Sequence, residues 1–254
     1  KKIFSVSIMP CTSKKTEANR PEMEVDGLRD VDVSLTTREL GDMIKQARIK
    51  FIGLPDEKPD SILGQYTGAG AIFGATGGVM EAALRTVADI LTGEDLDDIE
   101  YQGVRGLDGV KEASVVLPIE GKDTEVKIAV AHGTANAAKV LEAVKKGEKE
   151  YHFIEVMACP GGCVHGGGQS HVSAKKRLEV NPKAKRADAL YELDKSLPLR
   201  KSHKNPEVIK LYEDYLKEPN SHISHKLLHT HYYKRNAYEV GQQEEYDKIM
   251  EKIK

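Results

Sequence analysis

Alternating apolar and polar positions predict strands at several places along the chain. Lys2-Ile-Phe-Ser-Val-Ser-Ile-Met9 alternates and then becomes apolar, as a half-buried or buried strand does. Similar short segments predict strands over 31–35, 115–117, 126–131 and 151–157, with a turn over 120–123. The last of them, Tyr151 to Met157, is predicted to be buried because it is a short apolar run.

Helical spacing of apolar residues appears between these strands. Thr36-Thr-Arg-Glu39 is a capping-box pattern, and the helix that it starts is predicted to end near Arg48. A second helix is predicted from Gly78 to about Leu91, and a third opens at Gly133 and ends near Gly147. The second helix carries Val79, Ala82, Ala83, Val87 and Ile90 on one side, and the third has Ala137, Val140, Leu141 and Val144 at core spacing.

From residue 182 onward the sequence predicts helices and no further strands. Helices are predicted over 182–194, over 207–216 and from 222 to about 233, with a break at Pro219-Asn220 and a charged end over 241–254. Residues 17–30 and 53–64 are predicted loops. The order of elements favours an α/β fold, a layered sheet with flanking helices over 1–181, followed by a helical tail over 182–254.

Composition narrows the class of protein. The chain has 254 residues, 39% of them hydrophobic and 31% charged, which is typical of a globular protein with a sizeable core. A net charge of −2 gives no basic field, so we expect no nucleic-acid partner. No apolar run reaches the roughly 18 residues of a membrane span. The start lacks a signal-peptide pattern, and the abrupt opening strand suggests a piece of a longer chain or one subunit of a split one.

The cysteines carry the candidate chemistry. Three cysteines argue against a disulfide framework and fit a reducing cytoplasm or thiols committed to metal. Cys11, Cys159 and Cys163 all follow the ends of predicted strands, the edge where open α/β sheets bind ligands. Five of the eight residues from Gly161 to Gly168 are glycine, so bare backbone surrounds two of the thiols. Thiolates select zinc, copper(I) or iron–sulfur clusters.

Two other patterns suggest weaker hypotheses. Gly68-Ala-Gly70 with Gly74 resembles a dinucleotide fingerprint, but no good strand precedes it, so a tightly packed loop and helix start are favoured. His225 and His229 have the i, i+4 spacing of zinc ligands, but no catalytic glutamate motif accompanies them, which favours a tail that wraps the domain.

The two cysteine-containing segments, the glycine-rich run and the tail resemble segments of a known protein family. Met9-Pro-Cys-Thr-Ser-Lys-Lys-Thr-Glu17 and Met157-Ala-Cys-Pro-Gly-Gly-Cys-Val-His-Gly-Gly-Gly-Gln169 look like the second and third signature motifs of the iron-only (FeFe) hydrogenases. The run Gly68 to Glu81 and the tail from Leu211 to about Arg235 are also similar to segments of that family. The family's first motif, a Thr-Ser-Cys-Cys-Pro run upstream, is absent.

The resemblance implies a site and a cofactor. Residues 1–181 would be the second part of the H-cluster catalytic domain, and 182–254 a tail resembling the small subunit. Cys11, Cys159 and Cys163 would ligate the 4Fe-4S cubane of the H-cluster, and Cys163 would bridge to a two-iron subcluster with CO, cyanide and a dithiolate amine. A cubane takes four thiolates, so the fourth ligand and a proton-relay cysteine would lie in the missing motif.

Other residues near the motifs are given roles by the same resemblance. The Lys14 ammonium would donate to an anionic ligand such as cyanide, and Glu17 would orient it as a salt-bridge partner. Met9, Met157 and Phe73 would line the cluster cavity, where excluded water tunes the potential. For His165, an exposed position on the surface is as well supported as a functional role in the cysteine loop.

The sequence therefore predicts a hydrogenase that interconverts H2 with protons and electrons. Its partners would be H2, protons, an upstream segment or another chain with the missing cysteine motif, and a ferredoxin or other iron–sulfur carrier, in the cytoplasm and without a membrane span. Two alternatives stay open: a non-catalytic hydrogenase-like iron–sulfur protein of assembly or H2 sensing, and a structural zinc module of the three cysteines and a histidine.

Overall fold

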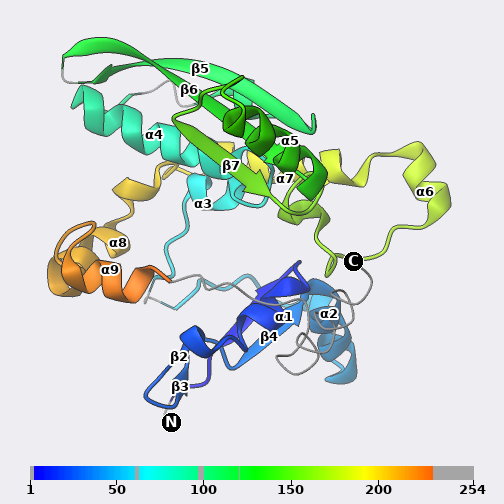
Figure 1. Cartoon of the computed structure of the whole chain (residues 1–254). Helices are drawn as coiled ribbons and strands as arrows, with labels where there is room; N and C mark the ends of the chain where they lie inside the picture. The colour runs from blue at the N-terminus through cyan, green and yellow to red at the C-terminus, as the bar shows by residue number, and fades with distance from the viewer. Residues whose placement is uncertain (1–2, 61–62, 97–99, 120, 231–254) are drawn as a thin grey trace, which may run out of the picture.

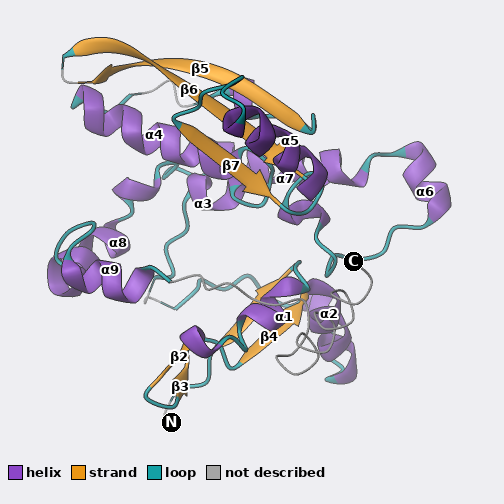
Figure 2. Cartoon of the chain, in the orientation of Figure 1, coloured by secondary structure: helices purple, strands orange, loops and turns teal. Residues whose placement is uncertain are grey.

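Two separate sheets organise the part of the chain that this computed structural model describes, residues 3–60, 63–96, 100–119 and 121–230. The larger sheet contains β5 (Val110–Ile119), β6 (Lys122–His132) and β7 (Phe153–Met157). Strand β6 is antiparallel to β5 and parallel to β7. The smaller sheet is a parallel pair, β1 (Val6–Met9) and β4 (Val33–Thr36) (Figures 1 and 2).

Helices cover both faces of the larger sheet. Side chains alternate along β6, so its apolar residues point to both faces and pack against a helix on each. Ile128 and Val130 pack with Met80 and Leu84 of α4 (Gly78–Thr92). Ala129 and Ala131 face the other way and pack with Val140 of α5 (Thr134–Lys145). The predicted layered α/β architecture is thereby confirmed.

The smaller sheet carries its own helices. Helix α1 (Ser13–Glu17) follows β1, and α2 (Thr37–Gln46) follows β4. Thr36 and Glu39 form the predicted capping box, since Glu39 N donates to Thr36 Oγ1 at 3.2 Å and Thr36 N donates to the Glu39 carboxylate at 2.8 Å. The predicted loop over 17–30 is partly wrong, because Asp26-Gly27 turns a short hairpin of β2 (Glu24–Val25) and β3 (Leu28–Arg29).

The tail runs back across the helices of the larger sheet. Gly68 and Ala69 open α3 (Gly68–Ile72) and donate their N–H groups to the carbonyls of Leu199 and Arg200 at 2.8 and 3.0 Å. The tail elements are α6 (Ala174–Glu179), α7 (Pro182–Ser196), α8 (Pro206–Leu211), the π-helical turn η6 (Tyr212–Leu216) and α9 (His222–Leu228). The short 3-10 turns are η1 (Pro21–Met23), η2 (Phe51–Gly53), η3 (Gln102–Val104), η4 (Cys163–His165) and η5 (Ser202–Lys204). The predicted helix beyond 228 and the end over 241–254 lie largely outside the described residues.

The buried face of α4 differs from the predicted one. Val87 and Ile90 are exposed, whereas Glu81, Arg85 and Asp89 are buried. These charges are tolerated because each is paired. The tail supplies Asp194 to Arg85 and Lys201 to Asp89, both at 2.8 Å, and Glu81 pairs with Arg85 and Arg105, both at 2.7 Å.

Two further burial predictions were wrong. On α5, Leu141 and Val144 are exposed although Ala137 and Val140 are buried. Strand β7 lies at a sheet edge, so Phe153 and Val156 are about half exposed and its buried residue is Glu155. The Glu155 carboxylate accepts the N–H groups of Gly77 and Met80 at 2.6 and 2.7 Å, at the start of α4. No helix in the described ranges is long and apolar enough to cross a membrane.

Candidate metal centre

The turn after β1 meets the turn after β7, although they come from different sheets. Gly168 N donates to the carbonyl of Pro10 at 3.1 Å, beside Cys11. A Cβ on Gly166 would lie 1.9 Å from the same carbonyl oxygen, so only glycine permits this approach. Arg38 N, at the start of α2, donates to Gly168 O at 3.3 Å. The two cysteine-bearing segments are thus in direct backbone contact.

The loop between Cys159 and Cys163 is closed by its own backbone and by the glycine-rich run. Gly162 N donates to Cys159 O at 2.9 Å, and Val164 N donates to Gly74 O at 2.9 Å. Gly162 has a φ of 92°, and a Cβ there would lie 2.7 Å from Thr76 N. Both the conformation and the space therefore require glycine at this position. The favoured loop and helix start are present, and among the described residues no strand leads into Gly68, as a dinucleotide fingerprint would require.

The Cys163 thiol responds to the other two cysteines. All three are free and partly buried. Burial raises the pKa of Cys163, the Cys11 and Cys159 thiols raise it further, and Lys14 opposes them. No three His, Cys, Asp or Glu side chains in the described ranges could hold one metal ion. The described geometry therefore gives no support to the alternative of a structural zinc module, whereas a cubane takes each thiolate on a different iron.

The predicted residues on the first motif lie together. Lys14 Nζ contacts Glu17 Oε1 at 2.8 Å across one turn of α1, with both side chains 39% exposed. Met9, Lys14 and Glu17 line one mainly apolar cavity of about 200 Å³. Met157 ends β7 and is partly buried, while Phe73 follows α3 and is 45% exposed.

Two arginines that were not predicted as site residues donate hydrogen bonds to backbone carbonyls of the loop that carries Cys163. Arg186 of α7 donates to the carbonyls of Val164 and Ser170, both at 3.0 Å. Arg38 donates to Gln169 O at 3.1 Å. The pKa of His165 is lowered, mainly by burial and to a lesser degree by the nearby cations Lys183, Arg186 and Arg177. No local motif identifies Arg186, because its contacts span 16 to 22 residues of sequence.

The histidine pair of the tail has a different arrangement from a zinc site. The rings of His225 and His229 meet edge to face with their centroids 4.4 Å apart. Within the described part of the chain, no third metal-ligating side chain joins them.

Comparison with known protein families identifies the family of this chain. The sequence profile described as iron only hydrogenase large subunit, C-terminal domain, matches residues 1–167, which include all three cysteines. The chain belongs to the iron-only hydrogenase family. A second profile, described as iron hydrogenase small subunit, matches residues 180–235.

Individual relatives agree with this family assignment. The chain is 52% identical to Iron hydrogenase 1 of Clostridium pasteurianum over 234 residues, which cover 92% of this chain and 40% of that protein. It is 33% identical over 244 residues to Protein NAR1 of Arabidopsis thaliana, covering 91% of this chain and 50% of that protein. A solved variant of the FeFe hydrogenase HydA1 from Chlamydomonas reinhardtii matches with a TM-score of 0.73 and 41% identity, over 90% of this chain and 63% of that one. The chain spans half or less of the length of these two curated relatives.

Proposed function

We propose that this chain is part of the catalytic H-cluster domain of an iron-only hydrogenase, which reversibly oxidises H2 and reduces protons. The observation that carries the proposal is the meeting of two cysteine turns from different sheets. The contact between Gly168 N and Pro10 O brings these turns together, and the pKa of Cys163 is raised by burial and then by the nearby Cys11 and Cys159 thiols. Such a spread of thiols suits a cluster better than a single ion.

The residues present fit the H-cluster as a donor set. Cys11, Cys159 and Cys163 supply three soft thiolates, and Gly162 and Gly166 let the backbone approach closely without side chains in the way. When bound, the H-cluster supplies the redox chemistry that joins two protons and two electrons to H2. The protein's part is to hold, orient and tune it.

Lys14 is the proposed electrostatic residue of the site. Its ammonium would donate to an anionic ligand of the two-iron unit, while Glu17 holds the amine from the other side at 2.8 Å. Met9, which lines the same cavity, and Met157, at the end of β7, would exclude water with Phe73. Excluding water strengthens the Lys14 contact, because local charges are screened less.

The fourth thiolate must come from outside this chain, because the three proposed ligands are its only cysteines. The same outside segment or subunit would carry the proton-relay cysteine. Electrons would leave through the cubane to a ferredoxin or another iron–sulfur carrier. We place the reaction in the cytoplasm, where thiols stay reduced.

Cysteine replacement tests the ligand set. The protein is assembled anaerobically with its fourth ligand, iron and sulfide, and its iron content and electron paramagnetic resonance spectrum are recorded. Cys159→Ala should lose the cubane signal. Ser114→Ala on β5, which also removes one side-chain heavy atom, should keep it. An unchanged signal in Cys159→Ala would refute the assignment.

A hydrogen assay tests the activity itself. The assembled protein is given a synthetic two-iron cofactor and a reduced viologen dye, and H2 is measured. We expect turnover only when the missing cysteine motif is supplied, because positioned proton transfer contributes roughly 10²–10⁴-fold. Sustained turnover by residues 1–254 alone would contradict the need for an outside segment.

A role in cluster assembly is the second candidate function. It is favoured by the 33% identity to Protein NAR1 and by similar values for proteins named cytosolic iron-sulfur assembly component 3. Such a protein would hold a cubane without the two-iron unit. The identity to the hydrogenases is higher, and Lys14, three residues after Cys11, forms an ion pair with Glu17 and would supply a cation for the two-iron unit.

A further inference from the structure

A buried lysine and a buried glutamate hold the two ends of one peptide group in the glycine-rich run. Lys111 of β5 is 8% exposed, and its amine donates to the carbonyl of Thr76 at 3.1 Å. Glu155 of β7 is 6% exposed, and its carboxylate accepts the N–H of Gly77 at 2.6 Å. The carbonyl of Thr76 and the N–H of Gly77 belong to the same planar peptide unit. Two charges of opposite sign therefore bind opposite ends of one peptide dipole.

These two charged side chains fix the orientation of the peptide group. Gly77 has a φ of 89°, and glycine adopts negative φ about as readily, so the local chain alone does not select one orientation. A half-turn of the peptide group would place its carbonyl toward the Glu155 carboxylate and its N–H toward the Lys111 amine. Burial lowers the pKa of Lys111 to about 8, while Glu155 and then Asp108 oppose the shift, so the amine is mostly charged at neutral pH. The flipped orientation is therefore strongly disfavoured.

The turn that contains this peptide group holds the backbone on both sides of Cys163. Thr76 N donates to the carbonyl of Gly161 at 3.1 Å, before the cysteine. Gly74 O accepts the N–H of Val164 at 2.9 Å, directly after it. The position of the Cys163 backbone therefore follows the conformation of the turn.

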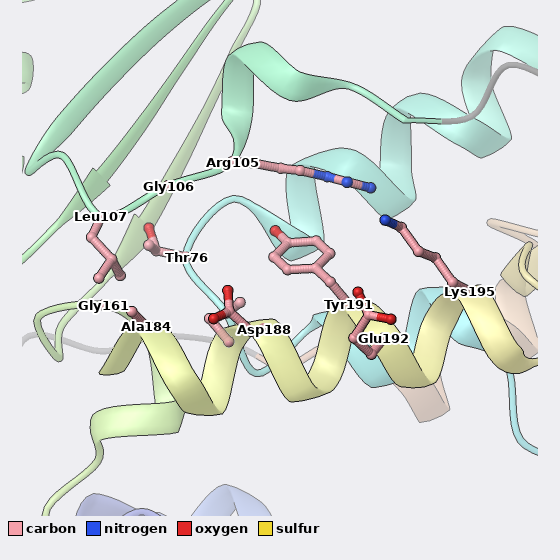
Figure 3. Close-up of a pocket in the computed structure, with 12 residues that line it drawn as sticks. Thr76, Arg105, Gly106, Leu107, Gly161, Ala184, Asp188, Tyr191, Glu192 and Lys195 are labelled. Carbon is pink, nitrogen blue, oxygen red and sulfur yellow. The ribbon is translucent and has the colours of Figure 1, made fainter. Parts of the chain in front are cut away.

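Two strands of the larger sheet anchor the turn. Figure 3 shows Thr76 close to Gly106 and Gly161, and all three line the same cavity. The Lys111 amine also donates to the carbonyl of Gly106 at 3.0 Å, so β5 holds the turn together with the segment that precedes the strand. Glu155 holds it from β7, the strand that leads into the cysteine loop. The two charges thus connect the sheet to the backbone around the candidate cluster ligands.

We propose that Lys111 and Glu155 are positioning residues for the iron–sulfur cluster. They orient the Thr76–Gly77 peptide group, and the turn in turn sets the place of the Cys163 thiolate. Both act through the backbone, because their hydrogen bonds in the described part of the chain go to backbone groups. The inference rests on the proposed function, since it needs the cysteines to hold a cluster.

Hydrogen exchange of the complete protein that carries this chain, in its metal-free form, measures the loop directly. Exchange is followed by mass spectrometry of peptides covering 158–168. Lys111→Met removes the charged donor, and exchange in this segment should become roughly tenfold faster or more. Lys201→Met is the matched control, because Lys201 is 6% exposed and donates to Asp89 and to Leu96 O, at 2.8 and 2.7 Å, at the far end of α4. It should leave exchange over 158–168 near the original rate.

Glu155→Gln tests the other end of the peptide group and keeps the size of the side chain. Its amide nitrogen would face the N–H of Gly77 or of Met80, which the carboxylate now accepts at 2.6 and 2.7 Å, so exchange over 158–168 should again rise. In the protein assembled with iron and sulfide, this variant and Lys111→Met should shift the g values of the cubane in electron paramagnetic resonance. Lys201→Met should keep them.

Unchanged exchange in Lys111→Met and Glu155→Gln, or an equal rise in Lys201→Met, would overturn the positioning role and leave a pair that only stabilises the fold. An original protein that takes up no cubane would instead refute the proposed function, so the two failures are distinguishable. Circular dichroism shows whether Lys111→Met is folded. If it is not, Glu155→Gln decides the question by itself.

Discussion

Asp194 is the residue whose loss should most weaken the attachment of the tail to the domain. Its side chain is fully buried and accepts from Arg85 at 2.8 and 2.9 Å and from Arg200 at 2.6 Å. Arg85 is also buried and contacts Glu81 at 2.7 Å. Removing one partner from a buried ion pair leaves an uncompensated charge and costs about 3–5 kcal/mol. We expect Asp194→Asn to lower the free energy of unfolding by about this amount.

Urea unfolding, followed by circular dichroism, measures this difference. The matched control is Asp214→Asn, whose partner Lys210 is 2.7 Å away but whose side chains are 61% and 72% exposed. That exposed pair should contribute far less, because solvent screens its charges. Equal losses in the two variants would refute the view that the buried network holds the tail.

The pH dependence of the same variant checks the cause. Burial raises the pKa of Asp194, but hydrogen bonds from Arg85 and then Arg200 lower it more, so the net pKa lies below its usual value. The carboxylate therefore stabilises the fold above the unfolded pKa, and this contribution is lost as pH falls through the folded one. The stability difference between Asp194→Asn and the original chain should shrink in acid. A difference that grows in acid would contradict this.

Three further predictions concern the site and the helices around it. Gly162→Ala should cost roughly 2–4 kcal/mol in urea unfolding, because it adds a clash with Thr76 to a strained φ, whereas Gly93→Ala, with positive φ but open space, should cost about 1–2. Burial lowers the pKa of Lys111 to about 8, so stability relative to Lys111→Met should rise between about pH 8 and the usual lysine value; a flat difference would contradict it. Lys14→Asn should keep the cubane but reduce loading of the two-iron unit about tenfold or more, and normal loading measured by iron content would count against its role.

Patterns that depend on neighbouring residues predicted the structure well. The capping box of Thr36 with Glu39, the alternation along β6 and the positions of cysteines after β1 and β7 all depend on local geometry, and the structure contains them. The hairpin at Asp26-Gly27 was missed although its turn signal is local, because the surrounding residues 17–30 are polar.

Burial of charged residues was beyond sequence reasoning. Glu81, Arg85 and Asp89 lie outside the apolar side predicted for α4, but Arg85 and Asp89 are paired with tail residues more than 100 positions away, and Glu81 is paired with Arg85 and Arg105. The same limit hid Arg186 and Glu155, whose backbone partners come from other segments. Apolar spacing alone therefore placed Val87 and Ile90 wrongly on the buried side of α4, and the hydrogen bonds of Arg38 and Arg186 to the cysteine loop had no local signal.

The most direct test of the central claim is infrared spectroscopy of the assembled protein, isolated without oxygen from a host that makes the H-cluster. The account predicts absorption bands of metal-bound CO and cyanide, together with the cubane signal in electron paramagnetic resonance, and loss of both in Cys163→Ala. A cubane signal with no CO or cyanide bands, in a preparation where a known hydrogenase gains them, would contradict the hydrogenase proposal and favour the assembly role.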